Sequence, residues 1–342
     1  MTPQPELAPW QTTGIGSMPQ RDPHEAARLI ASHTTLPYWP QLAALGAGED
    51  MVIQAAWGLP CLEVDLEARR VVARAKEREE ALTRFYEHLL AADVDYFAPP
   101  ESPGLDALLQ GLAGREPAWL KGQVAGPVTF GTTVKDEAGR DLIHDRELME
   151  ACCQGLAMKA LWQAKRFEER GARAVIFFDE PSLSALGSAF MAVERQGVAQ
   201  LLGLLFETVR AVSPEVVLGV HCCGNSDWPL LLSSGADIIS FDSWSYLDNF
   251  CLFPREIGAH LARGGMLAWG AVPTLEPVPG DWNLLLERLQ GGLARLTGAG
   301  VDGSLLRGRS LLTPSCGLGT LSEEGALQVL EALGWLRGRL LA

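Results

Sequence analysis

The chain has 342 residues, of which 47% are hydrophobic, and it carries 28 basic against 42 acidic side chains. This length and composition can bury a large core, so a globular protein is expected. The acidic excess argues against a nucleic-acid surface, which needs clustered Lys and Arg, and favours a small-molecule substrate. No apolar run reaches the ~20 residues of a membrane span, so no membrane association is expected.

The N-terminus and the cysteines indicate the compartment. The first residues, Met-Thr-Pro-Gln-Pro-Glu, have neither the basic region nor the apolar core of a secretory signal. The seven cysteines are an odd number and include two adjacent pairs, which fits reduced thiols better than a disulfide framework. A cytoplasmic protein is therefore expected.

The first third of the chain predicts two strands and a helix before it becomes irregular. Residues 12–18 form a short strand that ends in glycine and serine, and Asp22 with the following proline starts a helix. A second strand is predicted at 36–42, although its two prolines are unfavourable in a sheet. Residues 45–100 are hard to assign, and 94–98 is interpreted as an extra strand or an edge element.

From residue 118 onward apolar strands alternate with helices. A long helix at 146–170 has an apolar stripe that includes Cys152 and Cys153, which are therefore interpreted as core thiols, and another helix carries the apolar residues between Trp282 and Leu296. Cys222 and Cys251 are also interpreted as structural. The strands of this part are predicted at 118–124, 172–178, 216–220, 237–241, 265–270 and 305–312.

This alternation predicts an α/β protein with a parallel sheet, and the favoured architecture is a single (β/α)8 TIM barrel domain over residues 1–342. An open doubly wound sheet is the second choice, but no strand is followed by a Gly-x-Gly-x-x-Gly turn. In TIM barrels the chemistry lies at the C-terminal ends of the strands. Here those ends carry Ser17, the segment 126–129, Asp179, Glu180, His221, Cys222, Cys223, Asp242 and Cys316.

Two of these strand ends contain residues that can bind zinc. His221 and Cys223 are two positions apart at the end of a strand, so their side chains project to the same side. Cys316 follows another apolar strand and precedes a glycine in the same way. Imidazole and thiolate are zinc ligands, although a packed thiol beside a hydrogen-bonded imidazole is the simpler explanation of His-x-Cys alone.

Several motifs together resemble the catalytic barrel of cobalamin-independent methionine synthase, in the superfamily that also includes uroporphyrinogen decarboxylase and the methylcobalamin:coenzyme M methyltransferases. The resemblance covers nearly the whole chain. It is carried by Thr12-Thr-Gly-Ile-Gly-Ser17, Gly126-Pro-Val-Thr129, Asp179-Glu-Pro181, His221-Cys222-Cys223, Ala236-Asp-Ile-Ile-Ser-Phe-Asp242 and Ser315-Cys316-Gly-Leu318.

The resemblance implies a cytoplasmic zinc enzyme that methylates a thiol, homocysteine or a related compound, in methionine synthesis. His221, Cys223 and Cys316 would be the permanent zinc ligands and the catalytic residues through that zinc, with Asp242 or water in the fourth position. Ser17 and Asp179 would bind the polar end of the substrate. A free thiol has a pKa of about 8.5, whereas a zinc-bound thiol is deprotonated and can attack an electrophilic methyl group.

The chain also departs from the family, and the departures concern the methyl donor. It has no room for the second, N-terminal barrel that helps to hold the folate donor. Asp242 stands in place of a glutamate, no residue from Leu45 to Asp50 is assigned to the substrate-binding glutamate, and the active-site histidine has no counterpart near Trp269. The expected donor is therefore a methylcorrinoid, free or on a corrinoid protein. The alternatives are an enzyme like uroporphyrinogen decarboxylase and a non-catalytic zinc-binding barrel.

Overall fold

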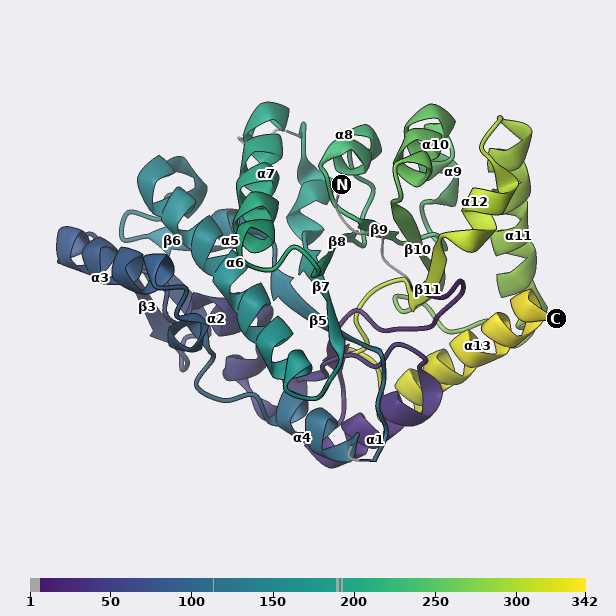
Figure 1. Cartoon of the computed structure of the whole chain (residues 1–342), viewed down its shortest axis with the longest axis horizontal. Helices are drawn as coiled ribbons and strands as arrows, with labels where there is room; N and C mark the ends of the chain where they lie inside the picture. Colours follow the sequence, from purple (N-terminus) through teal and green to yellow (C-terminus); the bar gives the residue numbers. More distant parts are fainter. Residues whose placement is uncertain (1–6, 113, 189–190, 192) are drawn as a thin grey trace.

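A curled, six-stranded parallel sheet forms the centre of the protein (Figure 1). The computed structural model describes residues 7–112, 114–188, 191 and 193–342. The strand order is β11-β10-β9-β8-β7-β5, so the strands of the second half of the chain lie side by side in sequence order. Their bounds are Trp119–Ala125 for β5, Arg173–Asp179 for β7, Val217–Cys222 for β8, Ile238–Phe241 for β9, Met266–Val272 for β10 and Ser310–Pro314 for β11.

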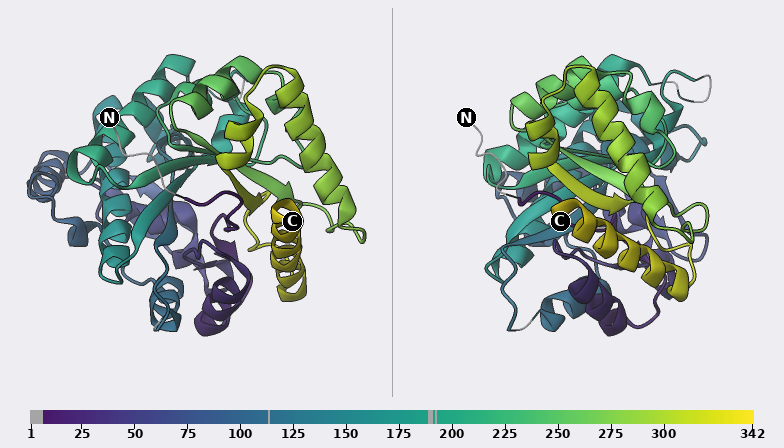
Figure 2. Two further views of the ribbon diagram at one scale, coloured as in Figure 1. Left: turned by 45° about the vertical axis from the view of Figure 1, so that its right-hand side comes forward. Right: turned by 90° about the vertical axis from the view of Figure 1, so that its right-hand side faces the viewer.

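Helices pack against the convex face of this sheet, as the two views of Figure 2 show. The longest, α6, contacts β5 and β7 and is capped at its N-terminus by Asp145, whose side chain accepts the Leu148 N–H. The described helices are α1 Pro23–His33, α2 Met51–Ala56, α3 Arg78–Leu90, α4 Pro103–Gly111, α5 Pro127–Thr133, α6 Arg146–Glu168, α7 Arg195–Val212, α8 Trp228–Ser233, α9 Leu247–Phe250, α10 Pro254–Ala262, α11 Asn283–Gly298, α12 Gly303–Gly308 and α13 Glu323–Leu341. None of the helices in the described ranges is long and apolar enough to cross a membrane.

Two short strands near the start of the chain pair with each other, and the residues ahead of them bridge to the two edges of the six-stranded sheet. β1 (Ser17–Met18) pairs in parallel with β2 (Gln41–Leu42). Ahead of β1, Thr12 bridges Leu312 of β11, and ahead of β2, Tyr38 bridges Lys121 of β5. The helix α1, which follows β1, contacts both α4 and the C-terminal helix α13. These short pairings connect the N-terminal segments to both edges of the six-stranded sheet.

The concave face of the sheet changes from apolar to polar along the strands. An apolar cluster that includes Trp119, Val175, Val217, Ile238, Met266 and Leu311 occupies its N-terminal side. Because side chains alternate along a strand, residues two and four positions further project from the same face. Those positions are polar near the C-terminal ends, where Gln123, Asp179, His221 and Asp242 are buried. The strands therefore collect buried polar groups at their C-terminal ends.

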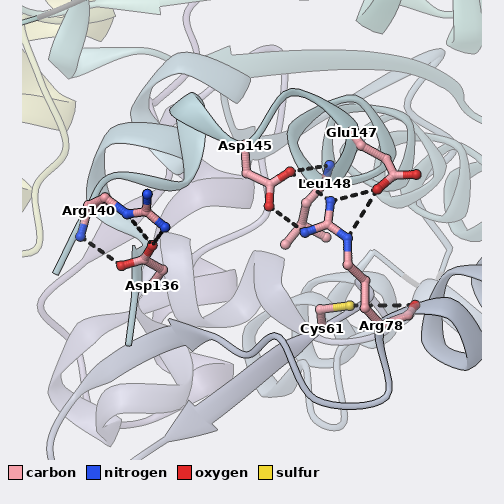
Figure 3. Close-up of polar contacts among 7 residues, drawn as sticks. All are labelled: Cys61, Arg78, Asp136, Arg140, Asp145, Glu147 and Leu148. Carbon is pink, nitrogen blue, oxygen red and sulfur yellow. Dashed lines mark hydrogen bonds and ion pairs between the residues drawn. The ribbon is translucent and has the colours of Figure 1, made fainter. Parts of the chain in front are cut away.

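A small appended sheet lies at the periphery with α3. It has the order β3-β4-β6, with bounds Leu62–Asp65, Arg70–Ala73 and Lys135–Asp136. Arg78, at the start of α3, donates to Asp145 at 2.7 Å and to Glu147 at 2.8 Å, at the start of α6 (Figure 3). In the same view Asp136 accepts from Arg140 at 2.8 Å, within the β6 turn. Arg78 thus connects the appended region to the long helix of the main body.

The sequence predicted β5, β7, β8, β9 and β10 and the helices α1 and α6 correctly, whereas its other strand predictions were wrong in whole or in part. Of the predicted strands 12–18 and 36–42, only Ser17–Met18 and Gln41–Leu42 are strands. Residues 94–98 are not a strand, since Val94–Phe97 is a 3-10 helix. The first half of the predicted strand 305–312 belongs to α12, because the Asp302 side chain accepts the N–H groups of Ser304 and Leu305 and starts a helix there. Four further 3-10 helices are described, at Ala43–Leu45, Ala47–Glu49, Leu142–His144 and Pro181–Ala185.

Candidate metal centre

Three predicted zinc ligands from two separate strands come together. His221, Cys223 and Cys316 each offer one ligand atom, and these atoms lie within 4.8 Å of one another. β8 and β11 are separated by β9 and β10 in the sheet, so in a flat sheet their ends would be roughly 14 Å apart. The curl of the sheet therefore creates the cluster. In the part of the chain that the structure describes, it is the one group of His, Cys, Asp or Glu with this spacing.

The orientation of His221 is fixed from one side only. Its Nδ1 lies 3.0 Å from the Ser240 hydroxyl, which occupies the paired position on β9. Its Nε2 is buried and has no hydrogen-bond partner. A buried polar atom without a partner is unfavourable unless a ligand completes it. Because metal-binding histidines commonly pair their second ring nitrogen in this way, His221 fits a metal ligand that binds through Nε2.

The two cysteines of the cluster shift each other's pKa in opposite directions. Hydrogen bonding from the Cys223 thiol, followed by contact with His221, lowers the pKa of Cys316, and the same Cys316 contact raises the pKa of Cys223. One thiolate is therefore stabilised next to one thiol. Thiolate sulfur and neutral imidazole nitrogen are the ligands that Zn²⁺ prefers, and catalytic zinc sites keep three protein ligands with one position open. This set of donors fits zinc.

Asp242 lies near this cluster in the sheet but outside the group of three. It follows β9, and its side chain is almost fully buried. Its Oδ1 accepts the Ser245 N–H at 2.8 Å, which orders the turn after the strand. Burial raises the pKa of this carboxyl group. The structure thus gives Asp242 a local partner of its own.

The two predicted substrate-binding residues flank the cluster. Asp179 ends β7 and pairs with His221 on the adjacent strand, and its Oδ1 is buried without a partner. Burial raises the Asp179 pKa to about 6. The Ser17 hydroxyl accepts the Gly319 N–H at 3.1 Å, and its carbonyl accepts the Leu318 N–H at 2.9 Å. Ser17 is therefore held against the loop that carries Cys316.

The loop after Cys316 requires glycine at position 317. A Cβ atom added to Gly317 would lie 2.2 Å from the Ser17 hydroxyl oxygen, which is far inside van der Waals contact. The glycine therefore allows the close approach of the two segments.

Two of the sequence motifs form a single interaction through Glu180. Its carboxylate accepts the N–H groups of Val128 at 2.9 Å and Thr129 at 2.7 Å. A Cβ atom added to Gly126 would lie 2.3 Å from the Glu180 carboxyl carbon, so this position also needs glycine. Burial raises the pKa of Glu180 to about 7, although these hydrogen bonds oppose the shift. Glu180 thus joins the end of β5 to the end of β7.

Sequence reasoning missed several buried polar groups near the strand ends. Glu49 lies between Leu45 and Asp50, where the sequence analysis assigned no substrate-binding glutamate. Its carboxylate accepts the Leu42 N–H at 2.7 Å. Ser240 and Lys121 were not singled out at all, although both are fully buried. The available signal was their alternation with inward-facing residues on the same strands, Ser240 with Asp242 and Lys121 with Gln123.

Two solved structures share this fold over nearly the whole chain. One is a B12-independent methionine synthase from Shewanella sp. W3-18-1 in complex with selenomethionine, with 17% identity and a TM-score of 0.59, and the match covers 98% of this chain and 99% of that one. The other, from Listeria monocytogenes, is provisionally named a vitamin-B12 independent methionine synthase. It has 14% identity, a TM-score of 0.54 and coverage of 98% and 99%. No protein-family model and no curated protein matches the chain.

Proposed function

We propose that the protein is a zinc-dependent methyltransferase that transfers a methyl group to a thiol, homocysteine or a close relative, in methionine synthesis. The proposal is carried by the buried, unpartnered Nε2 of His221 beside the thiols of Cys223 and Cys316. One nitrogen and two sulfur donors match a catalytic zinc site with an open position. The names of the two similar structures, one with bound selenomethionine, support the same choice.

The proposal includes a complete (β/α)8 barrel in one domain. Residues 12–18 and 36–42 would be its first two strands, completing the ring between β11 and β5. The bridges of Thr12 to Leu312 and of Tyr38 to Lys121 support this arrangement, together with the pairing of β1 and β2. We also propose a cytoplasmic location, because the cluster needs reduced thiols.

Each residue of the site has a distinct role in this proposal. A bound Zn²⁺ would supply a deprotonated substrate thiol at neutral pH. Ser240 holds the His221 ring, and Asp242 or water would provide the fourth ligand of a bound zinc. Asp179 has a buried oxygen without a partner, which can accept a hydrogen bond from a substrate ammonium group. Ser17 binds the same polar end from the other side.

The methyl donor has two candidates. One is a methylcorrinoid, free or bound to a corrinoid protein, because the resemblance has Asp242 in place of a glutamate and no counterpart of the active-site histidine near Trp269. The other is methyltetrahydrofolate, because the two similar structures are named B12-independent. We therefore place methylcobalamin first and methyltetrahydrofolate second.

The test supplies zinc-loaded protein with L-homocysteine and one donor at a time. We expect methionine to form with methylcobalamin, together with the absorbance change of cobalamin demethylation. Cys316→Ser should abolish turnover, whereas Cys153→Ser, a buried thiol on α6, should retain it. Methionine formed with methyltetrahydrofolate but not with methylcobalamin would show that the donor assignment is wrong, while the assignment as a thiol methyltransferase would stand. No methionine with either donor would contradict the proposed function.

The same preparation tests the two alternatives. A decarboxylase of the uroporphyrinogen class needs no zinc and uses arginines near the N-terminus, and residues 1–17 contain none. Porphyrinogen turnover by the metal-free protein would favour that alternative. Stoichiometric zinc without binding of any thiol would favour a non-catalytic zinc-binding barrel.

A further inference from the structure

A lysine is buried on the concave face of the sheet, below the metal centre. Lys121 is on β5 and has no measurable exposure to solvent. Its Nζ donates to the Ile15 carbonyl and, at 3.0 Å, to the Gln123 side-chain oxygen, and it lies 4.8 Å from the centre of the Phe177 ring. In the described ranges no carboxylate forms an ion pair with it. A buried amine needs hydrogen-bond acceptors, and here the Ile15 carbonyl and the Gln123 oxygen provide them.

The ammonium group connects β5 to the segment that carries Ser17. Ile15 lies between two glycines whose missing side chains leave room for close packing. A Cβ atom on Gly14 would lie 2.2 Å from the Tyr38 ring, and one on Gly16 would lie 2.7 Å from the Gln123 carboxamide carbon. Within the described residues, the pairing of β1 with β2 and the bridge of Tyr38 to Lys121 link this segment to β5 indirectly. The Lys121 hydrogen bond to the Ile15 carbonyl adds a direct link.

Lys121 and Asp179 lie on the same face of neighbouring strands. Asp179 is on β7, the strand next to β5, and is paired with Ala125, four residues beyond Lys121. Side chains four positions apart on a strand project to the same face. Lys121 thus contacts the segment of one substrate-binding residue and shares a face of the sheet with the other.

We propose that Lys121 is a positioning residue that makes the site selective for thiols with an amino-acid end. By holding the Ile15 carbonyl, it fixes Ser17 relative to Asp179, the two residues that would bind that end. This inference rests on the proposed function. It concerns the polar end of the substrate only, so it leaves binding of the sulfur atom to His221, Cys223 and Cys316 unaffected.

A second buried lysine provides a matched control. Lys159 is on α6, outside the sheet, and donates to the Trp57 carbonyl at 2.6 Å and the Phe97 carbonyl at 2.8 Å. Burial lowers the pKa of Lys159 to about 7, as it does for Lys121. The two lysines therefore share residue type, burial and carbonyl partners, and they differ in their contact with the strand-end site.

The experiment measures thiol binding to zinc-loaded protein by titration calorimetry, with L-homocysteine and with 1-propanethiol, which lacks the amino-acid end. Lys121→Met should weaken homocysteine binding about tenfold, as expected for a displaced polar contact, and change propanethiol binding less than about twofold. Lys159→Met should leave both affinities unchanged. If Lys121→Met does not fold, Lys121→Arg keeps the charge but displaces Ile15, and the same selective loss is expected.

The outcomes separate this inference from the proposed function. An unchanged preference for homocysteine in the folded Lys121 variant, or an equal loss for both thiols, would overturn the inference alone. The same selective loss in Lys159→Met would also overturn it, because the effect would then follow from any buried lysine. A wild-type protein that binds neither thiol would overturn the proposed function and this inference with it.

Discussion

Replacing Ser240 with alanine should weaken zinc binding while the sheet remains folded. The change removes one oxygen atom, and the His221 Nδ1 loses its 3.0 Å partner. The His221 side chain is only 2% exposed, so water cannot replace the hydroxyl freely. Zinc fixes both the ring and its tautomer, whereas the metal-free ring can reorient, so the loss falls mainly on the zinc-bound state.

The size of the effect follows from the burial of that hydrogen bond. Leaving a buried polar group without its partner costs about 1–3 kcal/mol. Because part of this cost is shared by the metal-free protein, we expect about a tenfold loss of zinc affinity, at the lower end of the effect of such supporting residues. The fold should be little affected, since serine and alanine differ by one atom.

The assay is competition for zinc with a chromophoric chelator at fixed pH. Ser310→Ala is the control, because the Ser310 hydroxyl is equally buried on β11 and accepts from an aromatic nitrogen, the Trp269 Nε1, at 2.8 Å. The control should retain wild-type affinity. Equal affinities in the two variants and the wild type would refute the view that Ser240 orients a zinc-binding His221.

Gly317→Ala should displace Ser17, because the added Cβ would lie 2.2 Å from the Ser17 hydroxyl oxygen, and should weaken homocysteine binding about tenfold while zinc is retained. Gly334→Ala, where the added Cβ meets open space, should leave homocysteine binding unchanged. Equal homocysteine affinities in the two variants would argue against the contact of Gly317 with Ser17. Lys159 is neutral above about pH 7 in the folded state but protonated to about pH 10 when unfolded, so it makes stability rise with pH between these values. In urea unfolding, Lys159→Met should reduce that slope by about 1 kcal/mol per pH unit, and an unaltered slope would exclude a lowered pKa. Arg78→Lys should lower the free energy of unfolding by about 1 kcal/mol, because lysine cannot reproduce the forked contacts with the two carboxylates at the start of α6, and unchanged stability would mean that these contacts are weak.

The central sheet could be predicted because its strands are apolar runs between helices. Apart from Arg173, the strands β7, β8, β9 and β10 are buried, and their sequences are mostly hydrophobic. The last strand was harder, since Leu305 and Leu306 extend its apolar run although Asp302 starts a helix there. The first two strands are held by isolated bridges and a two-residue pairing, which leave little periodicity in the sequence.

The candidate site could be predicted in composition but not in its three-dimensional arrangement. Alternation along β8 places His221 and Cys223 on one side, and a strand followed by cysteine and glycine indicated Cys316. The hydrogen-bond partners of Glu180 could not be predicted from the sequence, because its carboxylate accepts N–H groups of residues more than fifty positions earlier. The role of Lys121 was hidden for the same reason, since its contact with Ile15 depends on how the sheet curls.

X-ray absorption at the zinc edge, before and after addition of L-homocysteine, tests the central claim most directly. The account predicts one zinc per chain with two sulfur ligands, from Cys223 and Cys316, and a third sulfur when homocysteine binds. The remaining ligands should be the His221 nitrogen and an oxygen, from Asp242 or water, that the thiol replaces. A shell with two sulfurs that homocysteine leaves unchanged, or a purified protein that binds no zinc, would contradict the account.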